Sequence, residues 1–337
     1  MDKLKKYILP IGLLLSFLLL TGCSSEPSSS GNKKNKQITL ILDYIPNTNH
    51  SGIYVAQEKG YYADKGIDLN IIEPGDDSTS LALLGAGKGE FALSYQEDLT
   101  YATASKNPIP VKAVATVLQH NTSGFVALKS SGITSPKDFE DRVYAGWQSP
   151  SEEATLKAVM TKSGADYNKL TTVGDAGAGT GDLGKNVDIK WFFEGWDYTK
   201  AVMDGVELNY MPLNKLDDRL DFYTPILLTT DKLIDSDPEL IQDFVDATKK
   251  GYLYAIEHSD ESAEILHQAS PDQDLAFLKQ SQAFVSTHYT DTPESWGVMS
   301  QDVWDNYTDF MVEYQLIDHK IPAEQMFTNQ FISKEDK

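Results

Sequence analysis

From Gln37 onwards, short apolar strands alternate with helical segments, and this alternation limits the possible fold more than any other feature of the chain. Each apolar run is four to seven residues long and is bounded by polar or glycine-containing loops, as strands of a buried sheet are. A helix from about Ser51 to Gly60 follows the first run. Strands that alternate with helices predict a parallel, doubly wound sheet of the α/β class. The first three strands are expected at residues 38–42, 67–71 and 91–94.

A second series of strands and helices follows the first. The segment Ser149-Pro150-Ser151-Glu152 is typical of a capping box, in which Glu152 bonds back to Ser149, and it opens a helix that ends near Lys162. After Asp237-Pro238 the apolar spacing is helical, and helices are expected up to about Leu316. Further strands are expected at residues 111–117, 124–128, 143–147, 189–193, 208–212 and 225–230.

This order of elements predicts two lobes joined by two crossovers. About 300 residues follow the N-terminal region, which is long for a single core. We expect a first lobe at residues 37–126, a second lobe at 127–223, and a return at 224–332 that places the C-terminal helices on the first lobe. A cleft between two such lobes is a common binding site for small molecules.

The N-terminal residues are typical of a secreted lipoprotein. Lysines precede an apolar run that is too short to span a membrane, so residues 1–22 are interpreted as a signal peptide. The run ends in Leu20-Thr21-Gly22-Cys23, the pattern at which a bacterial lipoprotein is cut and lipidated on its cysteine. Residues 23–36 are polar and predict a flexible linker. We therefore expect the protein to lie outside the cytoplasmic membrane, attached to its outer face by the lipid on Cys23 alone.

Charge and cysteine content exclude several functions. The chain has 29 basic and 50 acidic side chains and a formal net charge of −21, which disfavours nucleic acid and anionic lipid as partners. Cys23 is the only cysteine, so neither disulfides nor a catalytic thiol are expected. We expect a monomer that is not an enzyme, with no catalytic residues, no cofactor and no metal.

Three segments carry a resemblance to a known family. Residues 42–56, together with Lys59-Gly60-Tyr61-Tyr62, are similar to the opening of substrate-binding lipoproteins for thiamine pyrimidine precursors, and residues 146–153 and 191–197 continue the similarity. These proteins resemble the pyrimidine synthases of thiamine formation and, more distantly, receptors for nitrate, sulfonates and taurine. The resemblance implies a type II periplasmic-binding-protein fold that delivers a formylated aminopyrimidine or hydroxymethylpyrimidine to the permease of an ABC importer.

A flat aminopyrimidine requires aromatic faces and a carboxylate at its amidine-like edge. Tyr44 follows the first strand, where the family carries an aromatic residue, usually tryptophan, that stacks on the ring. Trp147 ends a strand of the second lobe and is expected to face the cleft. Glu194 lies between apolar residues, where a carboxylate needs a partner that a ligand amine or cation supplies, and the family resemblance also matches an acid here. Trp196 is expected to stack.

The remaining candidates lie in polar loops. Tyr95 and Glu97 follow the third strand, although Glu97 also suits a helix cap, and Ser123 completes the set of expected ligand contacts. Asn47 and His50 follow the first strand. An asparagine in such a loop often bonds its own backbone, and His50 is equally suited to brace the start of the following helix.

Three other functions stay open at this stage. If stacking alone sets the specificity, the ligand could equally be another heteroaromatic molecule, such as riboflavin or thiamine. A sulfonate or nitrate receptor would need basic, donor-rich loops, whereas these loops are aromatic and acidic. A synthase would need the lysine and the cysteine cluster of those relatives, and residues 94–97 contain no lysine.

Overall fold

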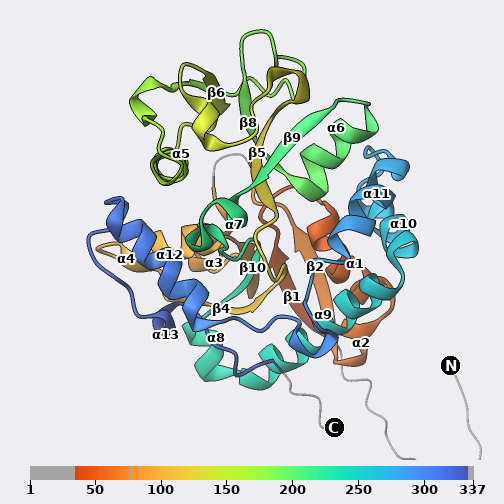
Figure 1. The fold of residues 1–337 in the computed structure, drawn as a ribbon. Helices are drawn as coiled ribbons and strands as arrows, with labels where there is room; N and C mark the ends of the chain where they lie inside the picture. Colours follow the sequence, from red (N-terminus) through yellow and green to blue (C-terminus); the bar gives the residue numbers. More distant parts are fainter. Residues whose placement is uncertain (1–34, 76–77, 333–337) are drawn as a thin grey trace, which may run out of the picture. The chain divides into compact units, whose positions relative to one another are not determined.

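The computed structural model describes residues 35–75 and 78–332. The predicted signal peptide, the predicted lipidation site Cys23 and the predicted linker up to residue 34 lie outside the described residues. The described residues belong to one compact unit, which contains two five-stranded sheets. These are the lower and upper groups of strands in Figure 1.

The first sheet has the strand order β2-β1-β3-β10-β4. β1 runs parallel to β2 and to β3, whereas β10 is antiparallel to both β3 and β4. The strands are β1 (Lys36–Ile41), β2 (Ile67–Ile72), β3 (Phe91–Ser94), β4 (Val111–Thr116) and β10 (Ile226–Thr230).

The second sheet repeats this arrangement with the order β7-β6-β8-β5-β9. β6 is parallel to β7 and β8, and β5 is antiparallel to β8 and β9. The strands are β5 (Ser123–Leu128), β6 (Val143–Gly146), β7 (Thr171–Gly174), β8 (Ile189–Phe193) and β9 (Leu208–Pro212).

The prediction of parallel sheets was therefore wrong in one respect, because both sheets are mixed. Each contains one strand that arrives from the other sheet: β5 enters the second and β10 enters the first. Such a strand begins where the parallel strands have their carboxyl ends, so it runs antiparallel to them. The α/β class and the alternation of strands with helices are as predicted.

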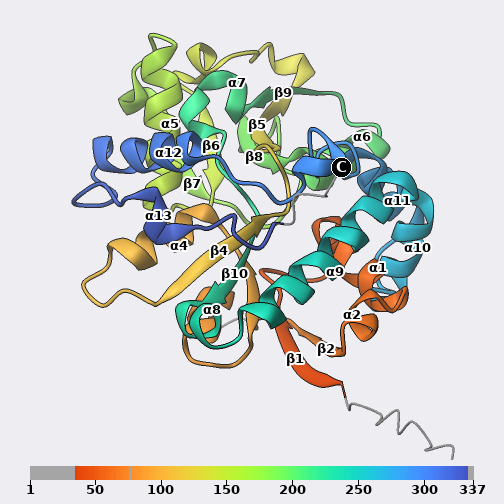
Figure 2. The same cartoon turned by 90° about the horizontal axis from the view of Figure 1, so that it is seen from below.

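Helices cover both faces of the first sheet (Figures 1 and 2). Adjacent residues of β1 point to opposite faces, so Leu40 joins one apolar cluster and Ile41 the other. On the Leu40 face, the ring of Phe244 stacks on Phe91 at a centroid distance of 3.8 Å. The helices on this face include α1 (Ser51–Glu58), α2 (Tyr61–Asp64) and α9 (Pro238–Glu257), and the opposite face is covered by α3 (Ser80–Gly85), α4 (Gln96–Ala104), α12 (Gln301–Glu313) and α13 (Ala323–Met326).

The remaining helices accompany the second sheet or the C-terminal segment. α11 packs against α10 and also against α6, and α8 lies beside α9. In the described part of the chain, no helix combines the length and the apolar character that a membrane crossing requires. The helices are α5 (Pro150–Lys162), α6 (Thr199–Met203), α7 (Leu213–Leu216), α8 (Asp231–Ser236), α10 (Ser259–Ala269) and α11 (Leu275–Val285).

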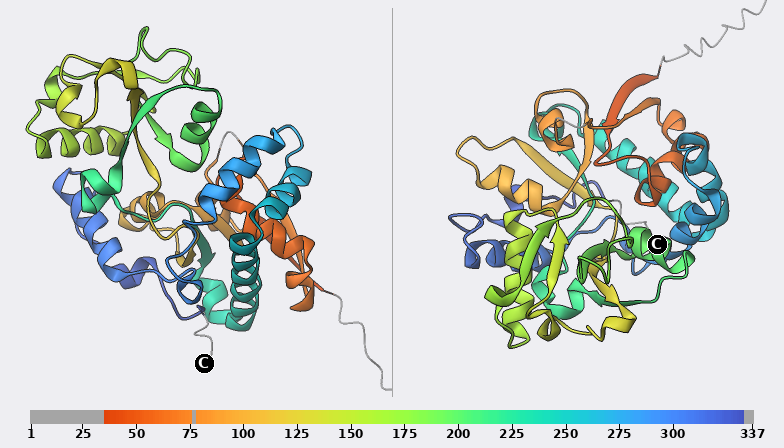
Figure 3. Two further views of the ribbon diagram at one scale, coloured as in Figure 1. Left: turned by 45° about the vertical axis from the view of Figure 1, so that its right-hand side comes forward. Right: turned by 90° about the horizontal axis from the view of Figure 1, so that it is seen from above.

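Two segments connect the sheets, one between β4 and β5 and one between β9 and β10 (Figure 3). The backbone N–H of Asn121 in the first segment donates to Asp221 in the second at 2.9 Å, so the segments are bonded to each other. The predicted boundary between residues 126 and 127 falls inside β5, and the lobe division stays a prediction.

Candidate functional site

The loop after β1 is organised around a buried pair, Asp43 and His50. The imidazole Nε2 of His50 lies 2.7 Å from Oδ1 of Asp43, and the side chains are 0% and 6% exposed. The other ring nitrogen, Nδ1, accepts the backbone N–H of Asn47 at 3.2 Å. Because Nδ1 accepts a hydrogen bond, Nε2 carries the proton of the neutral ring and donates it to Asp43. In this geometry His50 braces the loop, and neither ring nitrogen is left for a ligand.

The side chain of Asn47 also bonds only to the backbone of its own loop among the described residues. Its side-chain oxygen accepts the backbone N–H of Asn49 at 3.0 Å, and its amide nitrogen donates to the carbonyl of Ile45 at the same distance. Tyr44, which lies in the same loop after β1, is in contrast 59% exposed. Of the three residues predicted from this loop, only Tyr44 presents a free aromatic face.

The loop after β3 supplies Tyr95 and two acids at the start of α4. Burial, followed by the negative charges of Asp43 and Asp98, raises the pKa of Tyr95. Burial also raises the pKa of Asp98 to about 6, with Glu97 and Asp43 as further causes. Burial likewise raises the pKa of Glu97, and the hydroxyls of Ser151 and Tyr307 oppose that shift. This edge of the first sheet is therefore acidic, aromatic and poorly solvated.

In the second sheet, Trp147 follows β6 and is 59% exposed. Its ring meets Trp191 edge to face at a centroid distance of 5.6 Å. The backbone N–H groups of Trp147 and Gln148 donate to the carboxylate of Glu152 at 3.0 and 2.7 Å, which fixes the strand end.

The capping-box prediction was half right. Ser149 does cap α5 by accepting the N–H of Glu152, but Glu152 does not bond back to Ser149. Its carboxylate instead accepts the Tyr144 hydroxyl at 2.5 Å besides the two backbone groups at the end of β6. These three donors, all from residues of β6 or the loop after it, occupy both carboxylate oxygens of Glu152, so neither oxygen bonds to Ser149.

A hollow lies between β6, β7 and α5. Its volume of about 80 Å³ is smaller than that of a typical ligand pocket.

Glu194 begins the turn after β8 and is half-buried. Burial raises its pKa, and His288 partly offsets the shift. Within residues 35–75 and 78–332, no hydrogen bond or salt bridge of the Glu194 carboxylate is found, and the only charge that affects its pKa is that of His288. The charge of Glu194 in turn contributes, after burial, to the raised pKa of Tyr210. Glu194 is thus a partly desolvated acid near His288, and its role in ligand binding stays a prediction.

Trp196 and Ser123 lie in different surroundings from the other candidates. The ring of Trp196 packs edge to face on Phe277 of α11 at 4.7 Å. Ser123 is 1% exposed, and its N–H and hydroxyl both donate to the side-chain oxygen of Asn121, at 2.8 and 2.7 Å. The Ser123 hydroxyl is therefore part of the connection between the sheets.

The structure brings two groups of candidates together. Ser151 at the start of α5 donates to Glu97 of α4 at 2.7 Å, which places the Trp147 loop next to the Tyr95 loop. Sequence reasoning missed Asp43 and Asp98, and it did not name Trp191 among the site residues; Trp191 packs against the main apolar cluster and also contacts Trp147. Asp43 and Asp98 adjoin predicted residues at the ends of β1 and β3, and that position was an available signal. No group of three or more His, Cys, Asp or Glu side chains within the described ranges is arranged to hold a metal ion.

The chemistry of this arrangement suits a flat ligand that carries hydrogen-bond donors. Two exposed aromatic rings, Tyr44 and Trp147, come from equivalent strand ends of the two sheets. Glu194 and Asp98 are acids whose pKa values burial has raised, and such acids are stabilised by a cation or an N–H donor.

Comparison with solved structures defines the class of fold. The periplasmic aliphatic sulphonate binding protein SsuA from Escherichia coli aligns with a TM-score of 0.67 and 12% sequence identity, covering 86% of this chain and 91% of that one. The chain therefore has the two-lobed α/β fold of periplasmic binding proteins, and the predicted type II fold is confirmed.

Comparison with protein families is more specific. Residues 47–262 match the family described as NMT1/THI5 like, and the chain belongs to this family. The formylaminopyrimidine-binding protein of Halalkalibacterium halodurans is 23% identical over 327 residues, or 95% of this chain and 97% of that protein. The 4-amino-5-hydroxymethyl-2-methylpyrimidine phosphate synthase of Legionella pneumophila is 25% identical over 307 residues, or 88% and 92% of the two chains.

Proposed function

We propose that this protein is an extracytoplasmic solute-binding lipoprotein that captures a thiamine pyrimidine precursor and delivers it to an ABC importer. The ligand is N-formyl-aminopyrimidine or hydroxymethylpyrimidine. The observation that carries the proposal is the similarity to a formylaminopyrimidine-binding protein over 95% of the chain. The free aromatic faces of Tyr44 and Trp147 support it, because they suit a flat heterocycle.

In this proposal the pyrimidine ring lies between Tyr44 and Trp147. The exocyclic amine and a ring nitrogen face Glu194, whose carboxylate has lost solvent and, among the described residues, has no hydrogen bond to replace it. Bringing a donor to that carboxylate recovers part of the desolvation cost, which gives selectivity for an amine-bearing ring over an apolar one. Tyr95 lines the first-sheet side of the same site.

The location and the transport partner belong to the proposal as well. Signal cleavage before Cys23 and lipidation of its thiol would hold the protein at the outer face of the membrane. A permease would receive the ligand there, after a hinge motion at the two connecting segments. The lobes are taken as residues 37–126 with 224–332, and 127–223.

Calorimetric titration tests the ligand class. The purified full chain in detergent is titrated with N-formyl-aminopyrimidine, hydroxymethylpyrimidine, thiamine, riboflavin and an alkanesulfonate. We expect heat with the two pyrimidine precursors at the lowest ligand concentrations. Heat with riboflavin or the sulfonate and none with either pyrimidine would move the assignment to that other class.

A second candidate is a pyrimidine synthase, and the similarity to the Legionella pneumophila synthase favours it. Such an enzyme would hold pyridoxal phosphate on a lysine. The protein, incubated with that cofactor and separated from the excess, would then show the visible absorption of an internal aldimine. We expect no such band, and its appearance would replace the transport function by synthesis.

A further inference from the structure

The two sheets are held together differently on the two sides of the connecting segments. On one side α11 packs directly on the turn after β8 and on α6 (Figures 1 and 2). A Cβ on Gly195 would meet Phe284 Cδ1 at 2.8 Å and Val285 Cγ1 at 2.9 Å, so only glycine allows this approach. The hydroxyl of Ser281 donates to the carbonyl of Gly195. This side is a close-packed seam.

On the other side, the start of α5 of the second sheet is hydrogen-bonded to α4 of the first, and α12 bonds the same residue of α4. Oε1 of Glu97 accepts the Ser151 hydroxyl at 2.7 Å, and Oε2 accepts the Tyr307 hydroxyl at 3.1 Å. Tyr307 is 1% exposed, and it belongs to the apolar cluster that lies under α12 and continues into the second sheet. Glu97 thus links the buried hydroxyl of Tyr307, on α12 of the first sheet, to the hydroxyl of Ser151, on α5 of the second sheet.

The Glu97 carboxylate is also strained electrostatically. It is removed from water, and the charge of Glu152 at the start of α5 repels it. Separation of α4 from α5 would relieve both effects, whereas the Ser151 hydroxyl opposes separation. A hydrogen bond to a charged group contributes more than one between neutral groups, so this single contact has a large influence on the position of α5.

We infer that Glu97 is a positioning residue that holds α5 against α4 in this structure, and that its carboxylate is not a ligand contact. We call the Glu97–Ser151 hydrogen bond the latch. Its effect on ligand release rests on the proposed function, but its effect on the two helices does not. Because Trp147 lies three residues before the start of α5, the latch also fixes where the Trp147 ring lies relative to the Tyr95 loop.

The first test measures the distance between α5 and α12 in the ligand-free protein. Thr161 and Asn306 are exposed, and the only natural cysteine is Cys23, so T161C and N306C in a C23A chain give two unique spin labels. Pulsed electron resonance then reports the distance distribution. We expect S151A and E97A each to shift it to longer distances, and the double variant to shift it no further than either alone.

The matched control is E153A. Glu153 lies in the first turn of α5, two residues after Ser151, and its carboxylate pairs with Lys157 of the same helix at 2.6 Å, so its loss removes an acid from α5 but leaves the latch in place. We expect E153A to leave the distance distribution unchanged. If S151A and E97A keep the wild-type distribution, or if E153A shifts it equally, the latch does not exist.

The second test is the release of N-formyl-aminopyrimidine, followed by stopped-flow tryptophan fluorescence. Loss of the latch should speed dissociation about 10- to 150-fold, the range expected for one hydrogen bond to a charged group, and should change association little. Unchanged dissociation in S151A would overturn this role. If the wild-type chain binds no pyrimidine, the proposed function fails, and the distance measurement still decides whether the latch exists.

Discussion

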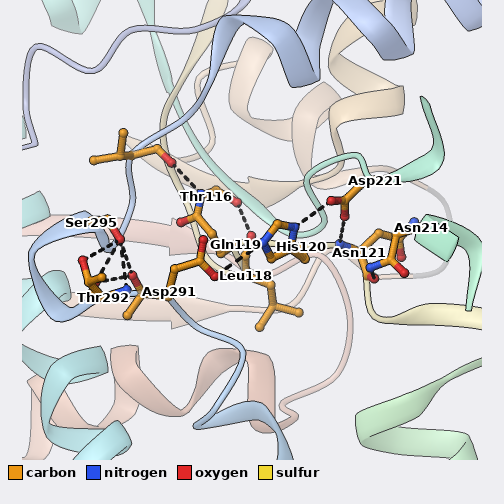
Figure 4. Close-up of polar contacts among 12 residues, drawn as sticks. Thr116, Leu118, Gln119, His120, Asn121, Asn214, Asp221, Asp291, Thr292 and Ser295 are labelled. Atoms are coloured by element: carbon orange, nitrogen blue, oxygen red, sulfur yellow. Dashed lines mark hydrogen bonds and ion pairs between the residues drawn. The ribbon is translucent and has the colours of Figure 1, made fainter. Parts of the chain in front are cut away.

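Nδ1 of His120 lies 2.6 Å from Oδ2 of Asp221, and this contact joins the two segments that connect the sheets (Figure 4). The other carboxylate oxygen of Asp221 accepts the N–H of Asn121 at 2.9 Å, and Asn214 donates to the carbonyl of Asn121 at 3.0 Å. Nε2 of His120 lies 3.4 Å from Asp291. The hinge proposed for ligand capture is therefore a hydrogen-bonded unit and not a pair of independent strands.

Asp221 is the centre of this unit, so D221N should destabilise the protein. The variant weakens the bonds to His120 and to the Asn121 N–H, and we expect a loss of about 1–3 kcal/mol in the free energy of unfolding, measured with urea. D291N is the control, because Asp291 is 66% exposed and touches His120 at a longer distance. Its effect should stay within about 0.5 kcal/mol. Equal losses in the two variants would contradict the central role of Asp221.

Asp98 should make stability fall as the pH rises. Its pKa is raised from 3.8 to about 6 in the folded protein, so the native state binds a proton that the unfolded chain releases between these values. Its favourable contribution is complete below pH 3.8 and is lost as the pH passes through about 6. At pH 7, D98N should therefore be more stable than wild type by up to about 3 kcal/mol.

Urea unfolding at several pH values checks this sign. The difference between D98N and wild type should grow from pH 4 to pH 7, because the comparison removes the titration of all other groups. A difference that is constant across this range would show that Asp98 titrates with an ordinary pKa.

Lys190 is fully buried in β8 and lies 2.9 Å from carboxylate oxygens of both Asp175 and Asp182. These acids flank the glycine-rich loop after β7, so the lysine fastens that loop to the sheet. K190A leaves two acids without their cation and should cost about 3–5 kcal/mol in urea unfolding. K185A, an exposed lysine of the same segment that donates to a carbonyl, should change stability by less than about 0.5 kcal/mol. A small effect of K190A would mean that solvent replaces the ion pairs.

Tyr44 and Trp147 should matter for ligand binding and not for stability, because both are 59% exposed. Stacking of an aromatic side chain on a base contributes about 1–3 kcal/mol, so Y44A and W147A should each weaken pyrimidine binding roughly 5- to 150-fold in calorimetry. V202A is the control, since Val202 is 51% exposed on α6. If V202A weakens binding as much as W147A does, the loss is not due to stacking.

The positions of most strands and helices could be predicted because apolar runs and caps mark them. The strand at residues 143–147 and the helix from Ser149 to Lys162 correspond to β6 and α5. β7 was missed because all four of its residues are exposed, so neither alternation nor an apolar run marks it. The antiparallel direction of β5 and β10 follows from the crossovers and leaves no local signal.

The candidate site was predictable only in part. Exposed aromatics at strand ends, such as Tyr44 and Trp147, follow from fold position and family resemblance. The partners of His50 and Glu152 could not be predicted, because they depend on where buried donors meet in space. Asp43 lies seven residues from His50 and Tyr144 lies eight from Glu152, and no periodic pattern connects these pairs.

A crystal structure of the protein with N-formyl-aminopyrimidine tests the central claim most directly. It should show the pyrimidine ring between the side chains of Tyr44 and Trp147, with a Glu194 carboxylate oxygen about 3 Å from the exocyclic amine or a ring nitrogen. A ring bound away from these two aromatic faces, or a Glu194 carboxylate with no contact to the ligand, would contradict the account.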